Sequence, residues 1–425
     1  MKKNPNTNSL ELAMNEMGEK ARIASRGLAA LNSFTKNSIL KAMADAIDKD
    51  ADLIIAENAK DLNTATEKGI PKPMIERLTL DKKRISSMSA GLRAMIELED
   101  PVGKIISSNI RPNGLKIDKV SVPIGVIAII YESRPNVTVD SAGLCIKAGN
   151  AVILRGGSES FNSNRALLHC INRAALEAGL PEGAIQMPAF TEREAVNIML
   201  KMDKYIDLVI PRGGEGLIRA VAQNSTIPVI KHYKGVCHLF VDSDADTDMA
   251  EKIIVNAKCQ RPGVCNAIET LLIHKDIAHK FAPKIAKILY DKGVELRGDC
   301  EFRKHVPKAI PANEQDWFEE YLDMILSVKV VSSVEEAVDH INFYGSRHSD
   351  GIIGKNAKNV AYFLNQVDSA VVYHNASTRF TDGGEFGMGA EIGISTDKLH
   401  ARGPMGLAEL NTYKYIVYGK GQCRN

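Results

Sequence analysis

The length, charge and composition of the chain exclude several classes of protein. Its 425 residues carry 54 Lys and Arg against 52 Asp and Glu, so no overall charge attracts nucleic acid or an anionic membrane. A hydrophobic content of 44% is ordinary for a folded globular protein, and the length predicts two or three domains. The seven cysteines are scattered without a Cys-x-x-Cys pair, which favours a reducing compartment over a disulfide framework.

Neither a targeting segment nor a metal motif is evident in the sequence. The polar start lacks the apolar stretch of a signal peptide, and the longest apolar run is too short to cross a bilayer. We therefore expect a cytoplasmic protein. Cys259 and Cys265 lie six residues apart, but no second pair or close histidine cluster completes a zinc site. The sequence predicts no bound metal.

The first hundred residues predict helices. Ser9 can cap a first helix, and further helical patterns cover residues 35–66 and 72–97. The pattern then changes to short alternating segments around Asn113 and Gly114. This change predicts a β-hairpin over residues 107–122.

A regular alternation of strands and helices follows the hairpin. Strand-like runs at 126–131, 151–154, 185–188, 206–210 and 228–230 alternate with helical patterns at 137–147, 161–178, 192–202 and from 213. Five strands and four helices joined by short loops predict a parallel sheet with right-handed crossovers. Because the strands are continuously apolar, both faces of the sheet should be covered. The prediction is a doubly wound α/β domain.

A second alternation begins near residue 236 and contains Cys265. Its strand-like segments are 270–273, 328–331, 351–354 and 370–374, and its helical patterns are 246–258, 276–291, 333–342 and 356–365. The last segment, 414–418, is a short strand that could pair with a hairpin elsewhere. We divide the chain into helices and a cofactor-binding domain (1–235, with the hairpin 107–122 inserted), a catalytic domain (236–395) and a return segment with an oligomerisation strand (396–425).

Glycines and one arginine indicate where a nucleotide would bind. The loop 132–136 after the first strand contains no glycine, which excludes the usual dinucleotide fingerprint there. Gly213, Gly214 and Gly216 follow the fourth strand, where amides at a helix N-terminus could hold phosphate or simply turn the chain. Arg155 and Ser158 follow the second strand and favour the 2′-phosphate of NADP, although the neighbouring Glu159 weakens this inference.

Cys265 is the candidate nucleophile. It follows Pro262 and Gly263, which favour a loop, and small neighbours leave room for a ligand. A free thiol is only about 3% ionised at pH 7, and Lys258 and Arg261 could favour the thiolate or could simply face solvent. The alternative interpretation is a small buried hydrophobe, the common state of a cysteine.

Several long segments resemble one protein family. They are 123–126, 131–138, 149–158, the run around Cys265 (260–270) and 401–407. With the two alternations, they resemble the aldehyde dehydrogenase superfamily and, within it, the gamma-glutamyl phosphate reductase family. The resemblance covers nearly the whole chain. It implies an α/β fold with a doubly wound five-strand cofactor domain, an α/β catalytic domain and a small β oligomerisation element.

The resemblance implies roles for particular residues. It makes Cys265 the nucleophile and Asn136 the amide that stabilises the oxyanion, together with the Cys265 backbone N–H. It also implies adenosine-ribose contact by Arg155, pyrophosphate contact at the turn 213–216 and nicotinamide-ribose contact by Glu320. Candidates for binding the substrate, which bears a carboxylate and a phosphate, are Arg134, Lys147, Asn375, Ser377, Arg379 and Arg402.

One departure from the superfamily pattern favours reduction. Oxidising members keep a glutamate that activates water, and His232 stands at that position here. A reductase gains from this change because its thioester must survive until hydride arrives. The resemblance thus implies NADPH-dependent reduction of L-glutamyl 5-phosphate to L-glutamate 5-semialdehyde in proline biosynthesis, by a homo-oligomer that could receive substrate from glutamate 5-kinase. An oxidising semialdehyde dehydrogenase and a non-catalytic binding protein on the same fold are the alternatives.

Overall fold

The computed structural model describes residues 5–424 and divides them into two compact units. Unit 1 contains the residues up to 231, then 387–393 and the residues from 405 onward. Unit 2 contains 232–386 and 394–404. The return of the chain is therefore not one segment from 396. Residues 394–404 stay with unit 2 because β14 (Ile394–Ser395) and β15 (Gly403–Pro404) pair with each other.

The helical start predicted from the sequence is confirmed, but Ser9 does not cap the first helix, because α1 already begins at Pro5. Its helices are α1 (Pro5–Ala29), α2 (Ser33–Lys49), α3 (Ala51–Glu67), α4 (Lys72–Leu78) and α5 (Lys82–Glu97). Asn32 and Asp81 begin α2 and α5, because each side chain accepts a backbone N–H of the first turn. The Asp81 cap explains why the pattern 72–97 divides into α4 and α5, whereas the pattern 35–66 divides at Asp50, whose side chain makes no capping hydrogen bond.

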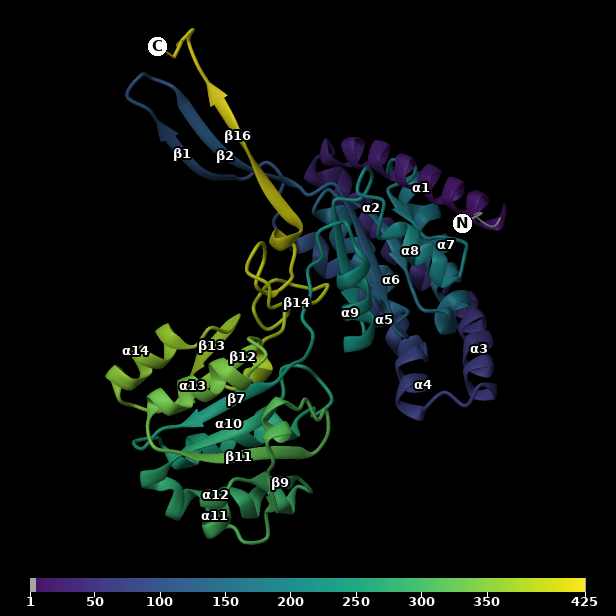
Figure 1. Cartoon of the computed structure of the whole chain (residues 1–425). Coiled ribbons are helices and arrows are strands. Elements are labelled where there is room, and N and C mark those ends of the chain that lie inside the picture. The colour runs from purple at the N-terminus through teal and green to yellow at the C-terminus, as the bar shows by residue number, and fades with distance from the viewer. Residues whose placement is uncertain (1–4, 425) are drawn as a thin grey trace. The chain divides into compact units, whose positions relative to one another are not determined.

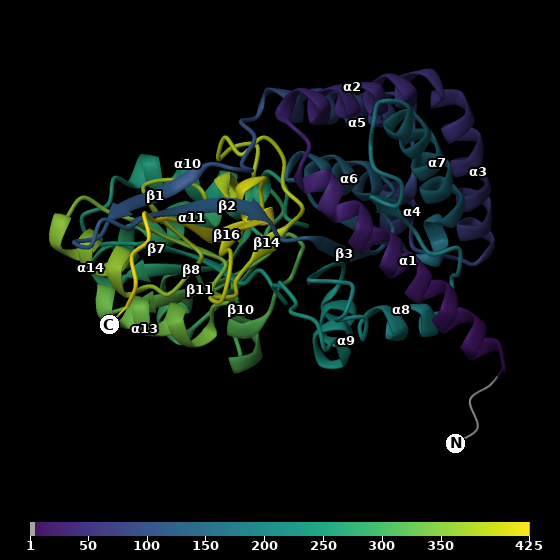
Figure 2. The ribbon, with the colours of Figure 1, turned by 90° about the horizontal axis from the view of Figure 1, so that it is seen from above.

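A parallel sheet of order β5-β4-β3-β6 forms the centre of unit 1. Its strands and helices are β3 (Val126–Tyr131), α6 (Asn136–Lys147), β4 (Ala151–Arg155), α7 (Phe161–Glu177), β5 (Ile185–Gln186), α8 (Arg193–Met199), β6 (Leu208–Arg212) and α9 (Glu215–Asn224). Helices α1, α8 and α9 lie on one side of this sheet (Figure 2), and their apolar side chains share a core with its strands. Because β3 and β6 are neighbours at the point where the strand order reverses, the loops that follow them lie side by side.

The fifth strand predicted for this sheet is reduced to one bridge. Val229 pairs in parallel with Val209, and no longer ladder forms in the described chain at 228–230. Pro228 has no N–H to donate, and the chain enters unit 2 two residues after Ile230. The prediction of five full strands is therefore corrected to four strands and a bridge.

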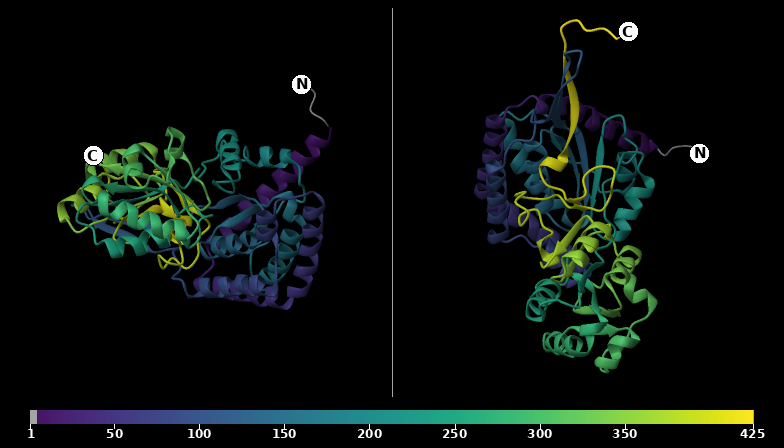
Figure 3. Two further views of the ribbon diagram at one scale, coloured as in Figure 1. Left: turned by 90° about the horizontal axis from the view of Figure 1, so that it is seen from below. Right: turned by 90° about the vertical axis from the view of Figure 1, so that its left-hand side faces the viewer.

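A three-stranded antiparallel sheet extends from unit 1 as an arm (Figures 1 and 3). The predicted hairpin is confirmed as β1 (Ile105–Ile110) and β2 (Lys116–Pro123). The last strand, β16 (Asn411–Tyr418), pairs with β2 along its full length. Large apolar side chains of the arm are exposed, namely Ile105, Ile106, Ile110, Tyr413, Tyr415, Val417 and Tyr418.

Unit 2 contains a seven-stranded parallel sheet of order β10-β9-β11-β8-β7-β12-β13. Its elements are β7 (Cys237–Val241), α10 (Thr247–Cys259), β8 (Ile268–His274), α11 (Lys275–Asp291), β9 (Glu295–Gly298), α12 (Cys300–His305), β10 (Ile310–Pro311), β11 (Ile325–Val331), α13 (Val334–Tyr344), β12 (Ser349–Ile353), α14 (Ala357–Gln366) and β13 (Val371–His374). One core joins the strands to α10, α11 and α12, and a second joins them to α13 and α14. The short elements β9, α12 and β10 were not predicted.

Among residues 5–424, no helix combines the length and the apolarity that crossing a membrane requires.

Candidate active site

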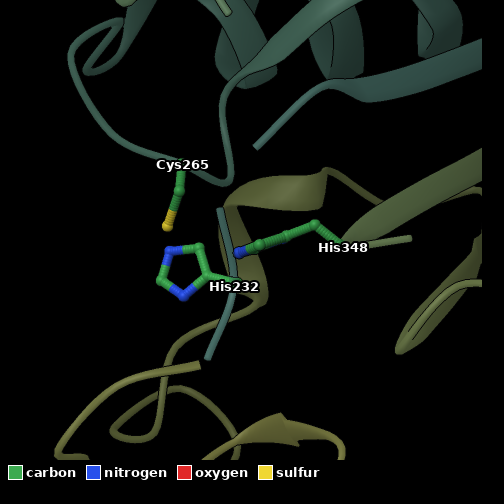
Figure 4. A group of neighbouring side chains, drawn as sticks. All are labelled: His232, Cys265 and His348. Carbon is green, nitrogen blue, oxygen red and sulfur yellow. The ribbon is translucent and has the colours of Figure 1, made fainter. Parts of the chain in front are cut away.

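The candidate nucleophile lies at the amino-terminal edge of the unit 2 sheet. Cys265 precedes β8, His232 precedes β7, and His348 immediately precedes β12. Because β8, β7 and β12 are parallel neighbours, their starts meet at one edge. The sulfur of Cys265 and one ring nitrogen of each histidine therefore lie within 4.8 Å of one another (Figure 4).

The backbone of Cys265 is held from two sides. A Cβ added at Gly235 would overlap the Cys265 carbonyl group, so only glycine allows this close approach. The Cys237 thiol contacts the same carbonyl oxygen at 3.2 Å. These contacts fix the peptide of Cys265, and its side chain remains only partly buried. The sequence interpretation of Cys265 as an inert buried hydrophobe does not fit this position.

His232 presents an acceptor nitrogen to the cysteine. Its Nδ1 lies 2.8 Å from the carbonyl oxygen of Ile394. A carbonyl oxygen can only accept, so Nδ1 carries the proton, and Nε2 is the acceptor nitrogen of the neutral ring. Figure 4 shows the other ring nitrogen, Nε2, facing the sulfur of Cys265. A thiol next to an imidazole whose second nitrogen is fixed has the arrangement of an activated nucleophile.

His348 is a fully buried neighbour of this pair. Its Nδ1 lies 2.8 Å from Ser349 Oγ, whereas its Nε2 is buried without a hydrogen-bond partner. Burial, and then the nearby His232, lower the pKa of His348 to about 3, so the ring is neutral at physiological pH. No pattern in the sequence indicated a role for His348, because it is remote from Cys265 along the chain.

The loop after Cys265 is anchored to a second loop that carries Arg379. Asn266 Nδ2 donates to the carbonyl oxygen of Thr381 at 2.9 Å, and Thr378 Oγ1 donates to that of Asn266 at 2.7 Å. Arg379 donates to the Asn266 side chain and lies within electrostatic reach of the Cys265 thiol. Burial, and then Arg261, lower the pKa of Arg379.

Ser377 begins the short turn η3 (Thr378–Phe380) by accepting the Arg379 N–H. Arg379 is thus the predicted substrate cation that the fold of unit 2 brings to the cysteine. Ser377 supports it.

Lys258, which could favour the thiolate, pairs with a buried carboxylate. Its Nζ lies 2.6 Å from Glu269 Oε2, and both side chains are fully buried. Burial raises the pKa of Glu269 to about 7 and lowers that of Lys258, against their mutual attraction. Glu269 Oε1 also accepts the Leu322 N–H at 3.2 Å. This pair ties α10, β8 and the loop 319–324 together beneath the cysteine loop.

Glu320 is held at the cysteine segment rather than solvated. Its Oε1 accepts the backbone N–H of Gly235 at 2.8 Å. Gly235 in turn packs on Cys265, so Glu320 contacts the residue that supports the nucleophile. The geometry keeps Glu320 among the candidate cofactor contacts.

Asn136 in unit 1 is positioned by Asp140. Asn136 begins α6 with its side chain exposed, and its Nδ2 donates to Asp140 Oδ2 at 2.9 Å one turn later. An amide nitrogen has two protons, so one remains to donate elsewhere. Burial raises the pKa of Asp140 to about 6.

The predicted pyrophosphate turn already holds an anion from the chain itself. The Gly214 N–H, at the start of α9, donates to Glu132 Oε2 at 2.9 Å. Glu132 follows β3 and Gly214 follows β6, the neighbouring strands at the switch point. The Gly214 amide therefore donates a hydrogen bond to an anion, and a phosphate bound at this turn would compete with Glu132 for that hydrogen bond.

Arg155 and Ser158 lie at the carboxyl end of β4. Arg155 donates to the carbonyl oxygens of Gly156 and Thr191, the latter at 2.9 Å, and its Nε is buried without a partner. Ser158 is exposed. Glu159 accepts the Ser133 N–H at 2.8 Å, which settles its direction: it turns toward Ser133.

Two predicted substrate residues have other partners. Lys147 is fully buried and donates from Nζ to Asn37 Oδ1 at 2.6 Å. Asn375 donates to and accepts from the backbone of Gly354, at the carboxyl end of β12 and so at the edge opposite Cys265. Lys147 and Asn375 thus join structural elements, and their contact with substrate stays a prediction.

Arg402 is engaged by a carboxylate, whereas Arg134 stays exposed. Arg402 donates to Asp368 Oδ1 at 2.9 Å and to the Asp368 carbonyl oxygen at 2.8 Å. Arg134 lies in the loop between β3 and α6 of unit 1, with its side chain exposed. Arg402 therefore needs an exchange of partners before it could bind substrate.

Comparisons with known proteins define the class. The family model described as "Aldehyde dehydrogenase family" matches residues 9–299, and the chain belongs to this family. The acetylating aldehyde dehydrogenase from Geobacillus thermoglucosidasius has the same fold, with a TM-score of 0.70 at 17% identity over 100% of both chains.

Two further proteins define the branch of the family. A gamma-glutamyl phosphate reductase from Moorella thermoacetica is 55% identical over 98% of this chain and 100% of its own. The crystal structure of the gamma-glutamyl phosphate reductase from Thermotoga maritima matches with a TM-score of 0.95 and 47% identity, over 97% of this chain and 100% of its own. The chain is thus a member of the gamma-glutamyl phosphate reductase family.

Proposed function

We propose that the chain reduces L-glutamyl 5-phosphate with NADPH to L-glutamate 5-semialdehyde and inorganic phosphate, as a step of proline biosynthesis. The observation that carries this proposal is the pair formed by Cys265 and His232. The thiol faces an imidazole whose tautomer is set by the Ile394 carbonyl oxygen. The high identity to a gamma-glutamyl phosphate reductase over nearly the whole chain supports L-glutamyl 5-phosphate as the substrate.

Cys265 acts first in the proposed mechanism. His232 Nε2 accepts the thiol proton, and the sulfur forms a bond to the acyl carbon. The bond from that carbon to the phosphate oxygen breaks, and His232 returns its proton to the departing phosphate. We assign to Asn136 the side-chain donor for the oxyanion, a contribution typically worth about 2.7–4 kcal/mol.

Reduction follows on the thioester. NADPH, when bound, supplies the hydride. The resulting thiohemiacetal oxygen re-forms a carbonyl as the carbon–sulfur bond breaks, which releases the aldehyde and leaves Cys265 as a thiolate. One proton taken from solvent restores the thiol, so each turnover consumes one NADPH and one proton.

Residues of unit 1 fit the cofactor. The Gly214 N–H already donates a hydrogen bond to a carboxylate, that of Glu132, and could donate to a phosphate in the same way. Arg155 donates to the backbone oxygens of Gly156 and Thr191, and an arginine at the end of the second strand suits a 2′-phosphate. We therefore propose Arg155 and Ser158 for the adenosine ribose, the turn 213–216 for the pyrophosphate and Glu320 for the nicotinamide ribose.

We also propose contacts for the substrate and for assembly. Arg379, supported by Ser377, binds the phosphate or the carboxylate, with Arg134 and Arg402 as the further cations. The exposed apolar side chains of the arm favour a homo-oligomer, because such a patch normally marks an interface. Glutamate 5-kinase is the natural supplier of the acyl phosphate.

The reaction run backwards tests the proposal. Pyrroline-5-carboxylate and NADP are mixed with the protein, and NADPH absorbance is followed with and without phosphate. Strict dependence on phosphate is expected, because phosphate must cleave the Cys265 thioester. Turnover without phosphate would mean that water accepts the acyl group, which is the oxidising dehydrogenase. No turnover by folded protein in either case would leave a non-catalytic binding protein.

A further inference from the structure

The edge of the unit 2 sheet that carries Cys265 also has the composition of a metal site. His232, Cys265 and His348 offer two imidazole nitrogens and one sulfur within 4.8 Å of one another. The spacing of cysteines in the sequence predicted no metal, because the two histidines are remote from Cys265 along the chain. Imidazole and thiolate are the ligands that Zn²⁺ prefers.

Both histidines have the second contact that metal-binding histidines normally make. His232 donates from Nδ1 to the Ile394 carbonyl oxygen, and His348 Nδ1 meets Ser349 Oγ. Each contact engages Nδ1, so Nε2 is the nitrogen of the ring that can bind a metal. The Nε2 of His348 is fully buried and has no hydrogen-bond partner, and Figure 4 shows a nitrogen at the far end of that ring directed toward the cluster. An unpartnered buried nitrogen of this kind calls for a ligand.

We propose that His232 Nε2, Cys265 Sγ and His348 Nε2 bind one Zn²⁺ ion, with water as the fourth ligand, and that the bound ion switches the nucleophile off. In tetrahedral coordination, bonds of about 2.0 Å to nitrogen and 2.3 Å to sulfur place the ligand atoms roughly 3.3–3.6 Å apart. The cluster needs to contract by about 1 Å at its widest, within reach of a side-chain rotation of the half-buried Cys265.

Binding replaces one bond by another in a balanced way. The Cys265 thiol loses its proton to solvent, and the sulfur forms a bond to Zn²⁺. The metal-bound sulfur and the metal-bound His232 Nε2 can no longer attack an acyl carbon or accept a proton. Mg²⁺ and Ca²⁺ prefer oxygen ligands and should not bind here.

Direct binding is measured without substrate or cofactor, so that its outcome is independent of the proposed reaction. Co²⁺ serves as the probe, because tetrahedral cobalt with a thiolate ligand gives intense visible and sulfur-to-metal absorption bands, and Zn²⁺ is then titrated to displace it. The protein carries Cys300→Ser and Cys423→Ser, which remove the two exposed thiols. We expect one cobalt per chain with a thiolate band.

Two variants test the ligands. His348→Asn keeps a group at the position of Nδ1 for Ser349 and removes Nε2, and we expect it to weaken Zn²⁺ binding by at least roughly 100-fold. Cys265→Ser should abolish the thiolate band. A second measurement does not depend on whether a variant folds. Cys265 is alkylated in the protein that keeps His232 and His348. Zn²⁺ should protect the thiol from alkylation, and Mg²⁺ should not.

The proposal is overturned if Zn²⁺ fails to protect Cys265 from alkylation. It is equally overturned if folded His348→Asn binds Zn²⁺ as tightly as the parent, since the ion would then sit on the thiol without the histidine. Phosphate-dependent turnover with no metal binding would remove this inference and keep the proposed function.

Discussion

The two units use opposite edges of their parallel sheets. In unit 1, the loops that matter follow the strands: Glu132 follows β3, and Gly214 follows β6. In unit 2 they precede the strands, since His232, Cys265 and His348 stand before β7, β8 and β12. Parallel strands begin at one edge and end at the other, so each edge gathers residues that are remote in sequence.

The difference matches the chemistry of the two edges. The carboxyl edge of unit 1 leads into helix N-termini, whose free N–H groups attract anions, and Glu132 demonstrates this on Gly214. The amino edge of unit 2 instead presents side chains on loops fixed by Gly235 and Asn266. Binding through amides suits a nucleotide, whereas a nucleophile needs a side chain with a partner base.

The largest expected effect concerns the amino edge of unit 2, which we propose carries the nucleophile. We expect Cys265→Ala to lower turnover by roughly 10⁴-fold or more, because the proposed mechanism forms the thioester on this sulfur. Steady-state assay of NADPH consumption measures this. Cys300→Ala is the matched control, since Cys300 is exposed at the start of α12, and its variant should keep the parent rate.

The support beneath the cysteine loop is tested through its buried ion pair. Lys258→Met leaves Glu269 without its partner, and we expect the free energy of unfolding to fall by about 3–5 kcal/mol. Chemical denaturation measures the change. The double variant Lys258→Met with Glu269→Leu removes both charges and should recover most of the loss. A single variant as stable as the parent would show that the pair does not hold the loop.

A pH profile tests the positioning of Asn136 by Asp140. Burial raises the pKa of Asp140 to about 6, so its carboxylate is charged above this pH and becomes protonated as pH falls below it. We expect Asn136→Ala to lower kcat by roughly 10²–10³-fold. Asp140→Asn should lower kcat less and flatten the fall of kcat below about pH 6.

The stability of the same Asp140 variant should change in the opposite direction. A carboxyl pKa raised in the folded chain means that folding disfavours the charge, so this residue lowers stability as pH rises from about 4 to 6. Asp140→Asn should therefore have a higher Tm than the parent at pH 7. A lower Tm together with lower kcat would indicate a merely structural role.

The smallest expected effect concerns the amide edge of unit 1. Glu132→Gln removes the negative charge that occupies the Gly214 N–H, and we expect NADP(H) to bind roughly two- to fivefold more tightly. Cofactor fluorescence titration measures this. Glu215→Gln is the control, because Glu215 lies in the same first turn of α9 but pairs with Arg219. Equal effects of both substitutions would point to general charge rather than to the Gly214 contact.

The sequence by itself determined the elements and the chemistry of single residues. Apolar runs and turn residues predicted the helices, the hairpin and both α/β alternations, because these follow local periodicity. Long motifs around Asn136 and Cys265 indicated the family and its nucleophile. Periodicity failed at residues 228–230, where Pro228 and the exit of the chain leave one bridge instead of a strand.

Only the tertiary structure decided which side chains meet. Some side chains have suitable groups but bind elsewhere. Lys147, a candidate for substrate binding, bonds to Asn37, and Asn375, another candidate, bonds to Gly354. Lys258, a candidate partner of the thiolate, pairs with Glu269. His348 carried no sequence signal and lies beside Cys265, because β12 and β8 both flank β7. Charge and hydrogen-bonding capacity belong to the residue and can be read from it. Partners depend on strand order, which local patterns do not contain.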